Sequence, residues 1–121
     1  MRPVFLLVAV WVMTAVSAHA QDAVKVDPKH YKVEFENERV RVLRVAYAPG
    51  EKSVMHEHPA NVAVFLTEGK GKFTLPDGTS QEVALKAGIT REGGAEKHMP
   101  ENVGDKPFEL ILVELKGSHG H

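Results

Sequence analysis

The sequence contains no cysteine, and this absence removes several kinds of chemistry at once. Disulfide bonds, thiolate metal sites and cysteine nucleophiles are all excluded. An excess of one charge is also lacking, because 15 basic and 16 acidic residues leave a formal net charge of −1. A chain so close to neutrality gives no reason to expect nucleic acid or an anionic membrane surface as a partner. Any metal or catalytic site must therefore be built from other residue types.

Long apolar runs are also missing, except for one at the start of the chain. Met1 to Pro3 give a short positive beginning, residues 4–16 are apolar, and Ala18 to Ala20 fit a cleavage site with small residues at both ends. This pattern predicts a secretory signal peptide over residues 1–20, cleaved after Ala20, and a periplasmic or secreted protein. An uncleaved membrane anchor is the alternative, although the run is shorter than the roughly 20 residues that span a bilayer. No membrane partner is expected after cleavage.

The rest of the chain lacks helical periodicity, and its length suits a single domain. Short segments rich in β-formers alternate with turn residues such as those at 76–79 and at 69–71. The expected strands cover residues 31–35, 39–48, 52–58, 62–67, 72–75, 81–85 and 108–115. This spacing predicts an all-β sandwich or barrel over residues 21–116, with a polar lead-in arm at 21–29 and a loose tail at 117–121. Within 39–48 the apolar parity shifts, which indicates a bulge or a strand covered on both faces.

The expected strand over residues 52–58 ends in two histidines separated by one residue. Side chains at alternate positions share one face of a strand, so His56 and His58 lie on the same side, about 7 Å apart at their backbones. Two such imidazoles can bind one metal ion, but they need a third ligand. Without a metal, the same pair would be two histidines satisfied by hydrogen bonds at a barrel rim.

The spacing around this pair resembles the first motif of the cupin superfamily. Gly50, His56, His58 and Gly69 stand at the motif positions, and Val62 occupies the position of its glutamate. The match extends to a second stretch that resembles the second cupin motif. That motif places a histidine four residues before an asparagine, as in His98 and Asn102, after Gly88.

The resemblance implies a double-stranded β-helix, a jelly-roll-like small barrel, with motif side chains holding a divalent metal at its mouth. Carried over by position, the ligands would be His56, His58 and His98. The segment between Gly88 and His98 is one residue shorter than the family pattern and lacks its Pro-x-Gly. A one-residue slip within a strand would turn His98 outward, whereas a deletion in the turn at residues 93–94 would not, and we expect the second case.

The missing glutamate changes the charge that such a site would have. A divalent ion on three neutral imidazoles keeps its +2 charge, so we expect the site to prefer an anionic, chelating small molecule. The resemblance implies a metal-dependent, dioxygenase-like enzyme for a small organic acid, with Fe(II) favoured over Zn, Mn, Ni or Cu. A non-catalytic cupin that binds a metal or small ligand is the alternative. Catalytic residues are not identified, and a homodimer is expected from the resemblance alone.

Other polar residues have simpler expected roles. Arg91 and Glu92 fit a short solvated edge strand, although either would become a fourth ligand or substrate contact if it faced the mouth. Tyr47 is a weaker candidate for the cavity. The remaining candidates are expected to be exposed carboxylates, a surface histidine and tail histidines: Glu57, Glu68, His30, His119 and His121. Barrel filling is expected from Val64, Leu66, Phe73, Leu75, Phe108, Leu110 and Leu112.

Overall fold

The computed structural model describes residues 21–117 and confirms the all-β class. One short helix, α1 (Ala23–Val26), precedes nine strands. The strands are β1 (Tyr31–Glu36), β2 (Val40–Tyr47), β3 (His56–His58), β4 (Asn61–Phe65), β5 (Gly69–Thr74), β6 (Ser80–Leu85), β7 (Thr90–Gly93), β8 (Glu96–Asn102) and β9 (Phe108–Leu115). Among these residues no helix is long and apolar enough to cross a membrane.

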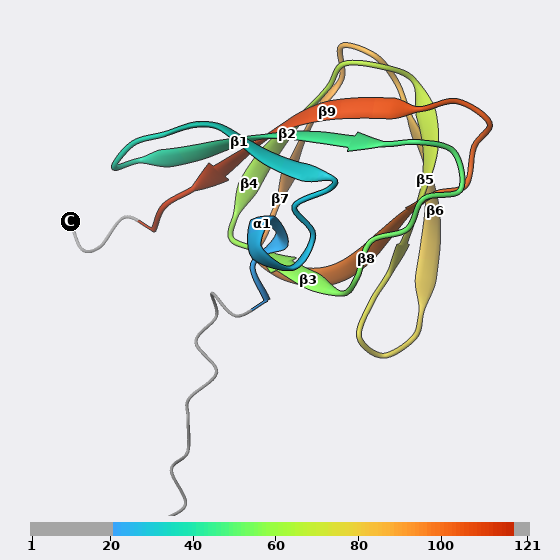
Figure 1. Cartoon of the computed structure of the whole chain (residues 1–121), viewed down its shortest axis with the longest axis horizontal. Helices are drawn as coiled ribbons and strands as arrows, with labels where there is room; N and C mark the ends of the chain where they lie inside the picture. The colour runs from blue at the N-terminus through green and yellow to red at the C-terminus, as the bar shows by residue number, and fades with distance from the viewer. Residues whose placement is uncertain (1–20, 118–121) are drawn as a thin grey trace, which may run out of the picture.

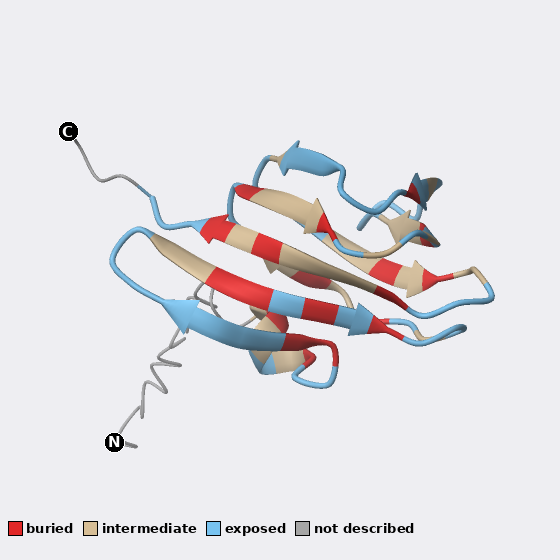
Figure 2. Ribbon diagram, turned by 90° about the horizontal axis from the view of Figure 1, so that it is seen from above, coloured by how far each residue is buried: buried red, intermediate tan, exposed pale blue. Residues whose placement is uncertain are grey.

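The strands form two antiparallel sheets that enclose a common interior (Figure 1). One sheet has the order β1-β2-β9-β4-β7 and the other the order β3-β8-β5-β6. Burial alternates along β2 from Leu43 to Tyr47, as expected when one face of a strand packs inward and the other meets solvent (Figure 2). The interior is filled mainly by aromatic and aliphatic side chains: Ala23, Tyr31, Leu43, Val45, Tyr47, Phe65, Leu85, Phe108 and Leu112.

The parity shift that the sequence showed in β2 has a structural counterpart. Val42 and Leu43 are adjacent and both buried. The pairing register of β1 against β2 shifts between Val33 and Phe35, which pair with Leu43 and Val42. The irregularity therefore lies in the partner strand, opposite the point where the parity changes.

Several expected element bounds need correction. The polar arm at 21–29 contains α1, and Ala23 belongs to the core. Gly69 and Gly71 are strand residues of β5, not a turn. The strand expected over residues 52–58 is limited to His56–His58. Lys52 lies outside it and forms only an isolated bridge with Glu101.

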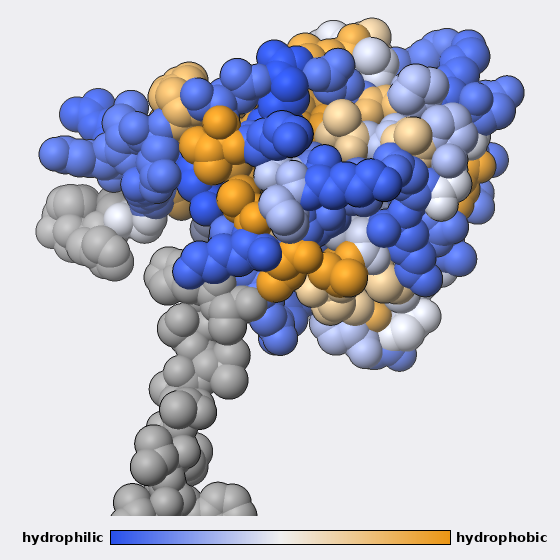
Figure 3. Space-filling model, in the orientation of Figure 1, coloured by the Kyte–Doolittle hydropathy of each residue, from blue (hydrophilic) through white to orange (hydrophobic). Residues whose placement is uncertain are grey.

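The inward parity of β4 also differs from the expected one. Asn61, Ala63 and Phe65 line the interior, so the alternate positions Val64 and Leu66 do not fill it. On the face seen in Figure 3, apolar surface residues lie in short patches among hydrophilic ones. The large apolar side chains that remain exposed are Val33, Phe35, Val54, Leu66, Leu75, Ile89 and Leu115.

Candidate metal centre

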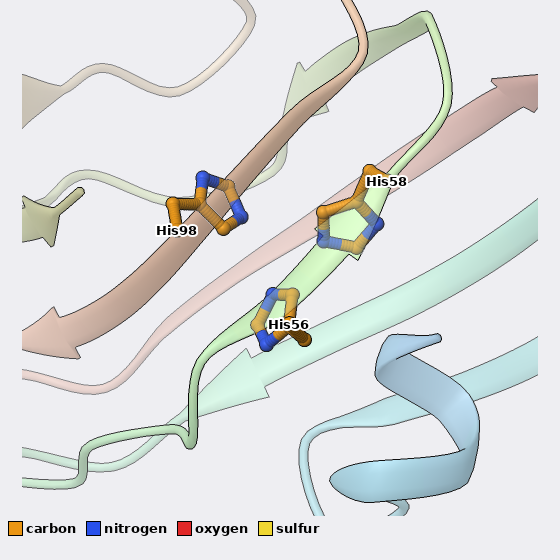
Figure 4. A group of neighbouring side chains, drawn as sticks. All are labelled: His56, His58 and His98. Carbon is orange, nitrogen blue, oxygen red and sulfur yellow. The ribbon is translucent and has the colours of Figure 1, made fainter. Parts of the chain in front are cut away.

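The three predicted ligands come together on the inner face of one sheet (Figure 4). His56 and His58 share a face of β3, and β8 pairs beside it with His98 directly opposite His56. At least one ring nitrogen of each histidine lies within 4.8 Å of one from each of the others. The expectation that His98 points inward is confirmed. The glycines at 93 and 94 precede β8, so the shortened segment is absorbed before the strand begins.

Asn102 ends β8 and ties this strand to the neighbouring loops. Its amide nitrogen donates to the carbonyls of Tyr47 at 3.0 Å and Lys106 at 2.8 Å, and its oxygen accepts from the backbone of Gly104 at 2.9 Å. Asn102 is fully buried, and its spacing of four from His98 keeps both on one face of the strand. The asparagine of the second motif is therefore a structural anchor for the histidine strand.

Hydrogen bonds fix the ring orientation of the two histidines on β3. His56 Nδ1 lies 2.9 Å from the carbonyl oxygen of Val54 and 3.0 Å from the Ser53 hydroxyl. A carbonyl can only accept, so Nδ1 carries the proton and Nε2 keeps a free lone pair. His58 Nδ1 donates to the carboxylate of Glu114 at 2.7 Å, which likewise leaves its Nε2 free. Both rings have the tautomer that metal binding through Nε2 requires.

His98 has no such orienting bond among the described residues. Neither of its ring nitrogens has a hydrogen-bond partner, although its side chain is only 11% exposed. The Glu96 carboxylate lies 2.9 Å from Nδ1 but outside hydrogen-bonding geometry. His56 Nε2 is also buried and unpartnered. Buried polar atoms without a partner are costly, and here they converge on one point.

Burial keeps these imidazoles neutral. Desolvation, with a smaller contribution from His58, lowers the pKa of His56 to about 4. Desolvation, followed by the effect of His58 and His56, lowers the pKa of His98 to about 3. Neutral imidazole is the form that binds metal, so neither ring has to lose a proton at neutral pH before it can act as a ligand.

The donor set fits a divalent transition metal. Imidazole nitrogens suit Fe, Zn, Cu and Ni, and a bound nitrogen lies about 2.1 Å from the ion. Two such nitrogens can be at most about 4.2 Å apart. The ring nitrogens lie up to 4.8 Å apart, so a small rotation of the rings would bring them to the separation that a shared ion requires.

A pocket of about 660 Å³ opens beside the histidines between the two sheets. Its inner wall holds Tyr31 and Tyr47, whose hydroxyl groups are 2.7 Å apart and whose rings are buried. Desolvation raises the pKa of both phenols, so both are protonated at neutral pH. Tyr47 was expected to be only a weak candidate for the cavity, and this was wrong, because Tyr47 lines the pocket. The charged residues that line the pocket are Arg91, Glu92 and Glu96.

The glutamate position of the first motif does not face this pocket. Val62 alternates with Asn61 and Ala63, which line it, and so lies on the other face of β4. The sequence analysis missed the carboxylate that does serve the site, Glu114, whose side chain is only 2% exposed. A signal for it was present, since Glu114 continues the alternating inward series of Phe108, Leu110 and Leu112 with a charge.

Other candidates also find their places. His30 is buried, not a surface residue: it stacks on Tyr47 with ring centroids 4.1 Å apart and bonds Asp27 at 2.7 Å. Arg91 and Glu92 lie on the exposed edge strand that was expected, yet they also border the pocket. Glu57 is half-buried between the two histidines of β3. Glu68 is exposed and pairs with Lys106 at 3.1 Å. The predicted signal peptide, His119 and His121 lie outside the described residues.

Comparison with known proteins agrees with this architecture. Residues 43–114 match the cupin domain family. No curated protein matches the sequence significantly. The fold is similar to a cupin domain from Bordetella pertussis Tohama I, with a TM-score of 0.67 and 28% identity over 72% of this chain and 92% of that one.

Two further solved structures show the likeness of fold alone. One is a protein with a double-stranded β-helix domain from Klebsiella pneumoniae, with a TM-score of 0.59 and 24% identity, covering 74% of this chain and 78% of that one. The other is the DMSP lyase DddQ from Ruegeria pomeroyi, with a TM-score of 0.54 and 14% identity, covering 78% and 51%. The predicted double-stranded β-helix is confirmed, and the chain belongs to the cupin domain family.

Proposed function

We propose that this cupin binds one divalent metal through His56, His58 and His98 and acts as a dioxygenase-like enzyme on a small organic acid. The observation that carries the proposal is the grouping of three histidines whose ring nitrogens lie within 4.8 Å of one another, next to a pocket that His58 and His98 line. Fe(II) is the metal we favour, because three facial imidazoles leave coordination positions open. When bound, the ion supplies a Lewis-acid centre at which two small ligands can meet.

The pocket offers groups that suit a small carboxylate. Arg91 pairs with Ala63 across β7 and β4, and both border the pocket. Among the described residues Arg91 has no ion-pair partner, so its guanidinium is available for a carboxylate. The inner wall includes Phe73, Leu110 and Leu112, which can cover the carbon skeleton. A metal with three neutral ligands adds further preference for an anion.

Metal content and oxygen uptake test the proposal together. The protein is purified anaerobically, assayed for metals, reloaded with Fe(II), and mixed with a panel of small carboxylic acids and their neutral amides. We expect stoichiometric iron, oxygen consumption with at least one acid, and weaker binding of the amides. Equal affinities for acids and amides would contradict the preference for anions. Stoichiometric metal without oxygen uptake would favour a non-catalytic binding protein.

Export is proposed from the N-terminal sequence and has its own test. Cleavage after Ala20 would give a mature chain that begins at Gln21. N-terminal sequencing of the protein from periplasmic and culture fractions should find Gln21 first. Recovery in the cytoplasm of a chain that still begins at Met1 would contradict it.

A further inference from the structure

We infer that the N-terminal segment, residues 21–30, positions two of the three histidines of the metal site. Two aspartates at the ends of α1, Asp22 and Asp27, each anchor a hydrogen-bond chain that ends on a different ligand histidine. Docking of the segment and binding of the metal then stabilise each other. This inference rests on the proposed metal site and extends it to residues that neither cupin-like motif contains.

The first chain runs from Asp22 to His58 across the end of the barrel. The Asp22 carboxylate makes a two-point ion pair with the guanidinium of Arg41, with one of the two contacts at 3.1 Å. Arg41 Nε donates to Glu114 Oε1 at 2.7 Å, and the other oxygen of Glu114 accepts from His58 Nδ1 at 2.7 Å. Arg41 and Glu114 are cross-strand partners on β2 and β9, so the sheet itself holds this pair in place.

The second chain runs from Asp27 to His56. Asp27 Oδ2 accepts from the Ser53 hydroxyl at 2.6 Å, and that hydroxyl lies 3.0 Å from His56 Nδ1. The same oxygen of Asp27 lies 2.7 Å from His30 Nδ1. Asp27, Ser53 and His30 are all buried. A buried carboxylate is retained only where partners satisfy it, and two of those partners connect it to the histidine ligand and to the stacked His30–Tyr47 pair.

The segment also covers the free edge of the histidine strand. β3 has only three residues and lies at the end of its sheet. Asp22 forms a parallel bridge with Glu57, the residue between the two histidines, and α1 packs against β1 and β3 (Figure 1). So short an edge strand has few backbone bonds of its own. Its position therefore depends on the segment beside it.

The conformation of α1 indicates that Asp22 serves the site and does not serve to stabilise the helix. A helix of four residues is not stable alone. Asp22 stands at the N-cap, where an aspartate normally caps the helix, but its side chain makes no capping bond and binds Arg41 instead. The carboxylate is thus diverted from the helix to the chain of contacts that leads to His58.

A group that bonds a ligand histidine directly orients it, and removing such a group usually costs about 10–100-fold in metal affinity. Asp22 and Asp27 act further out, through Arg41 and Glu114 and through Ser53, so the loss expected for either aspartate is at the lower end of this range. Coupling between two binding events is reciprocal, so a segment that strengthens metal binding must itself be stabilised by the metal. The inference therefore predicts two independent effects. Loss of either aspartate weakens metal binding, and the metal protects residues 21–30 from local opening.

The test uses Asp22→Asn and Asp27→Asn, with Lys25→Gln as a matched control. Lys25 lies on α1 between the two aspartates and is exposed. Co(II) is the probe, because its visible spectrum reports ligand geometry while a competing chelator gives its dissociation constant. We expect each aspartate variant to bind Co(II) more weakly, by about 10-fold at the lower end of the range for outer partners, with an altered spectrum. Lys25→Gln should match the wild type in both.

Amide hydrogen exchange of the wild type, with and without Co(II), needs no variant and covers the case in which a variant fails to fold. We expect slower exchange over residues 21–30 when the metal is bound. Unchanged Co(II) affinity and spectrum in both variants, or equal exchange of the segment with and without Co(II), would overturn the inference while leaving the three-histidine site intact. Failure of the wild type to bind Co(II) would instead overturn the proposed metal site beneath it.

Discussion

At the scale of single residues, the site depends on imidazoles that stay neutral inside the barrel. Their neutrality has a cost when the protein carries no metal. Because burial lowers the pKa of His56 and His98 below the ordinary value of 6.5, the unfolded chain binds more protons than the folded chain at mildly acidic pH. The free energy of unfolding is therefore highest above about pH 6.5. It falls as the pH drops from there toward the lowered pKa values of about 4 for His56 and about 3 for His98.

This pH dependence can be measured by urea unfolding of the metal-free protein at pH 7.5, 6.0 and 5.0. Each histidine can contribute up to about 1.4 kcal/mol per pH unit in this interval, where most carboxylates are still ionised. The variant His98→Gln, which cannot titrate at this position, should show a smaller loss. A free energy of unfolding that is constant from pH 7.5 to 5.0 would contradict the lowered pKa values.

Asn102 offers a second test at this scale. Replacing it by alanine leaves the buried carbonyl of Tyr47, the part-buried carbonyl of Lys106 and the backbone N–H of Gly104 without this partner. We expect Asn102→Ala to lower the free energy of unfolding by about 2–4 kcal/mol. Asn37→Ala is the control, since its two backbone contacts are exposed and water can replace them. Equal losses in the two variants would show that burial of Asn102 is not the cause.

The sequence predicted the three histidines that the fold brings together but not the carboxylate that bonds one of them, His58. The H-x-H spacing determines that His56 and His58 share a face, whatever the rest of the fold does. Whether Val62 faces the pocket depends on how residues 59–60 lead into β4, which spacing alone does not determine. Glu114 is 56 residues from His58, and only the pairing of β9 with β4 and β2 brings it near.

At the scale of elements, β5 shows why glycine alone is a weak signal for a turn. Gly69 and Gly71 look like turn residues in the sequence, yet both are paired with β6. Glycine is required at 69 by packing: a Cβ there would lie 2.9 Å from the Cβ of Phe108. β5 can approach the start of β9 closely because residue 69 has no Cβ.

Substitution of two glycines separates packing from flexibility. Gly69→Ala should lower the free energy of unfolding by about 1–3 kcal/mol, because the contact at Phe108 is with an atom next to the backbone and cannot swing away. Gly94→Ala is the matched control: no atom lies within 4 Å of an added Cβ, and the residue has no positive φ. We expect a change below about 0.5 kcal/mol there. Chemical denaturation of both variants measures these changes. An unchanged free energy of unfolding in Gly69→Ala would refute the packing explanation.

The short helix α1 was not predicted, and its length explains why. Four residues give too little periodicity to detect, and the segment reads as polar. Its position depends on contacts with Arg41 and Ser53, which come from β2 and from the loop before β3. Local sequence therefore gives little information about a segment that tertiary contacts hold in place.

At the scale of the whole molecule, the all-β fold followed from strand alternation and turn spacing, which are local properties. The pocket did not follow from them, because its walls come from both sheets and its mouth includes the edge strand β7. The expected homodimer and the signal peptide stay predictions.

The central claim is that one divalent ion binds through His56, His58 and His98. Titration of the metal-free protein with Co(II), followed by visible absorption and calorimetry, tests it most directly when the wild type and His98→Ala are compared. We predict one equivalent per chain for the wild type, and at least a 100-fold loss of affinity in His98→Ala with an unfolding midpoint close to that of the metal-free wild type. Binding of one equivalent with unchanged affinity in His98→Ala, or no binding by the wild type, would contradict it.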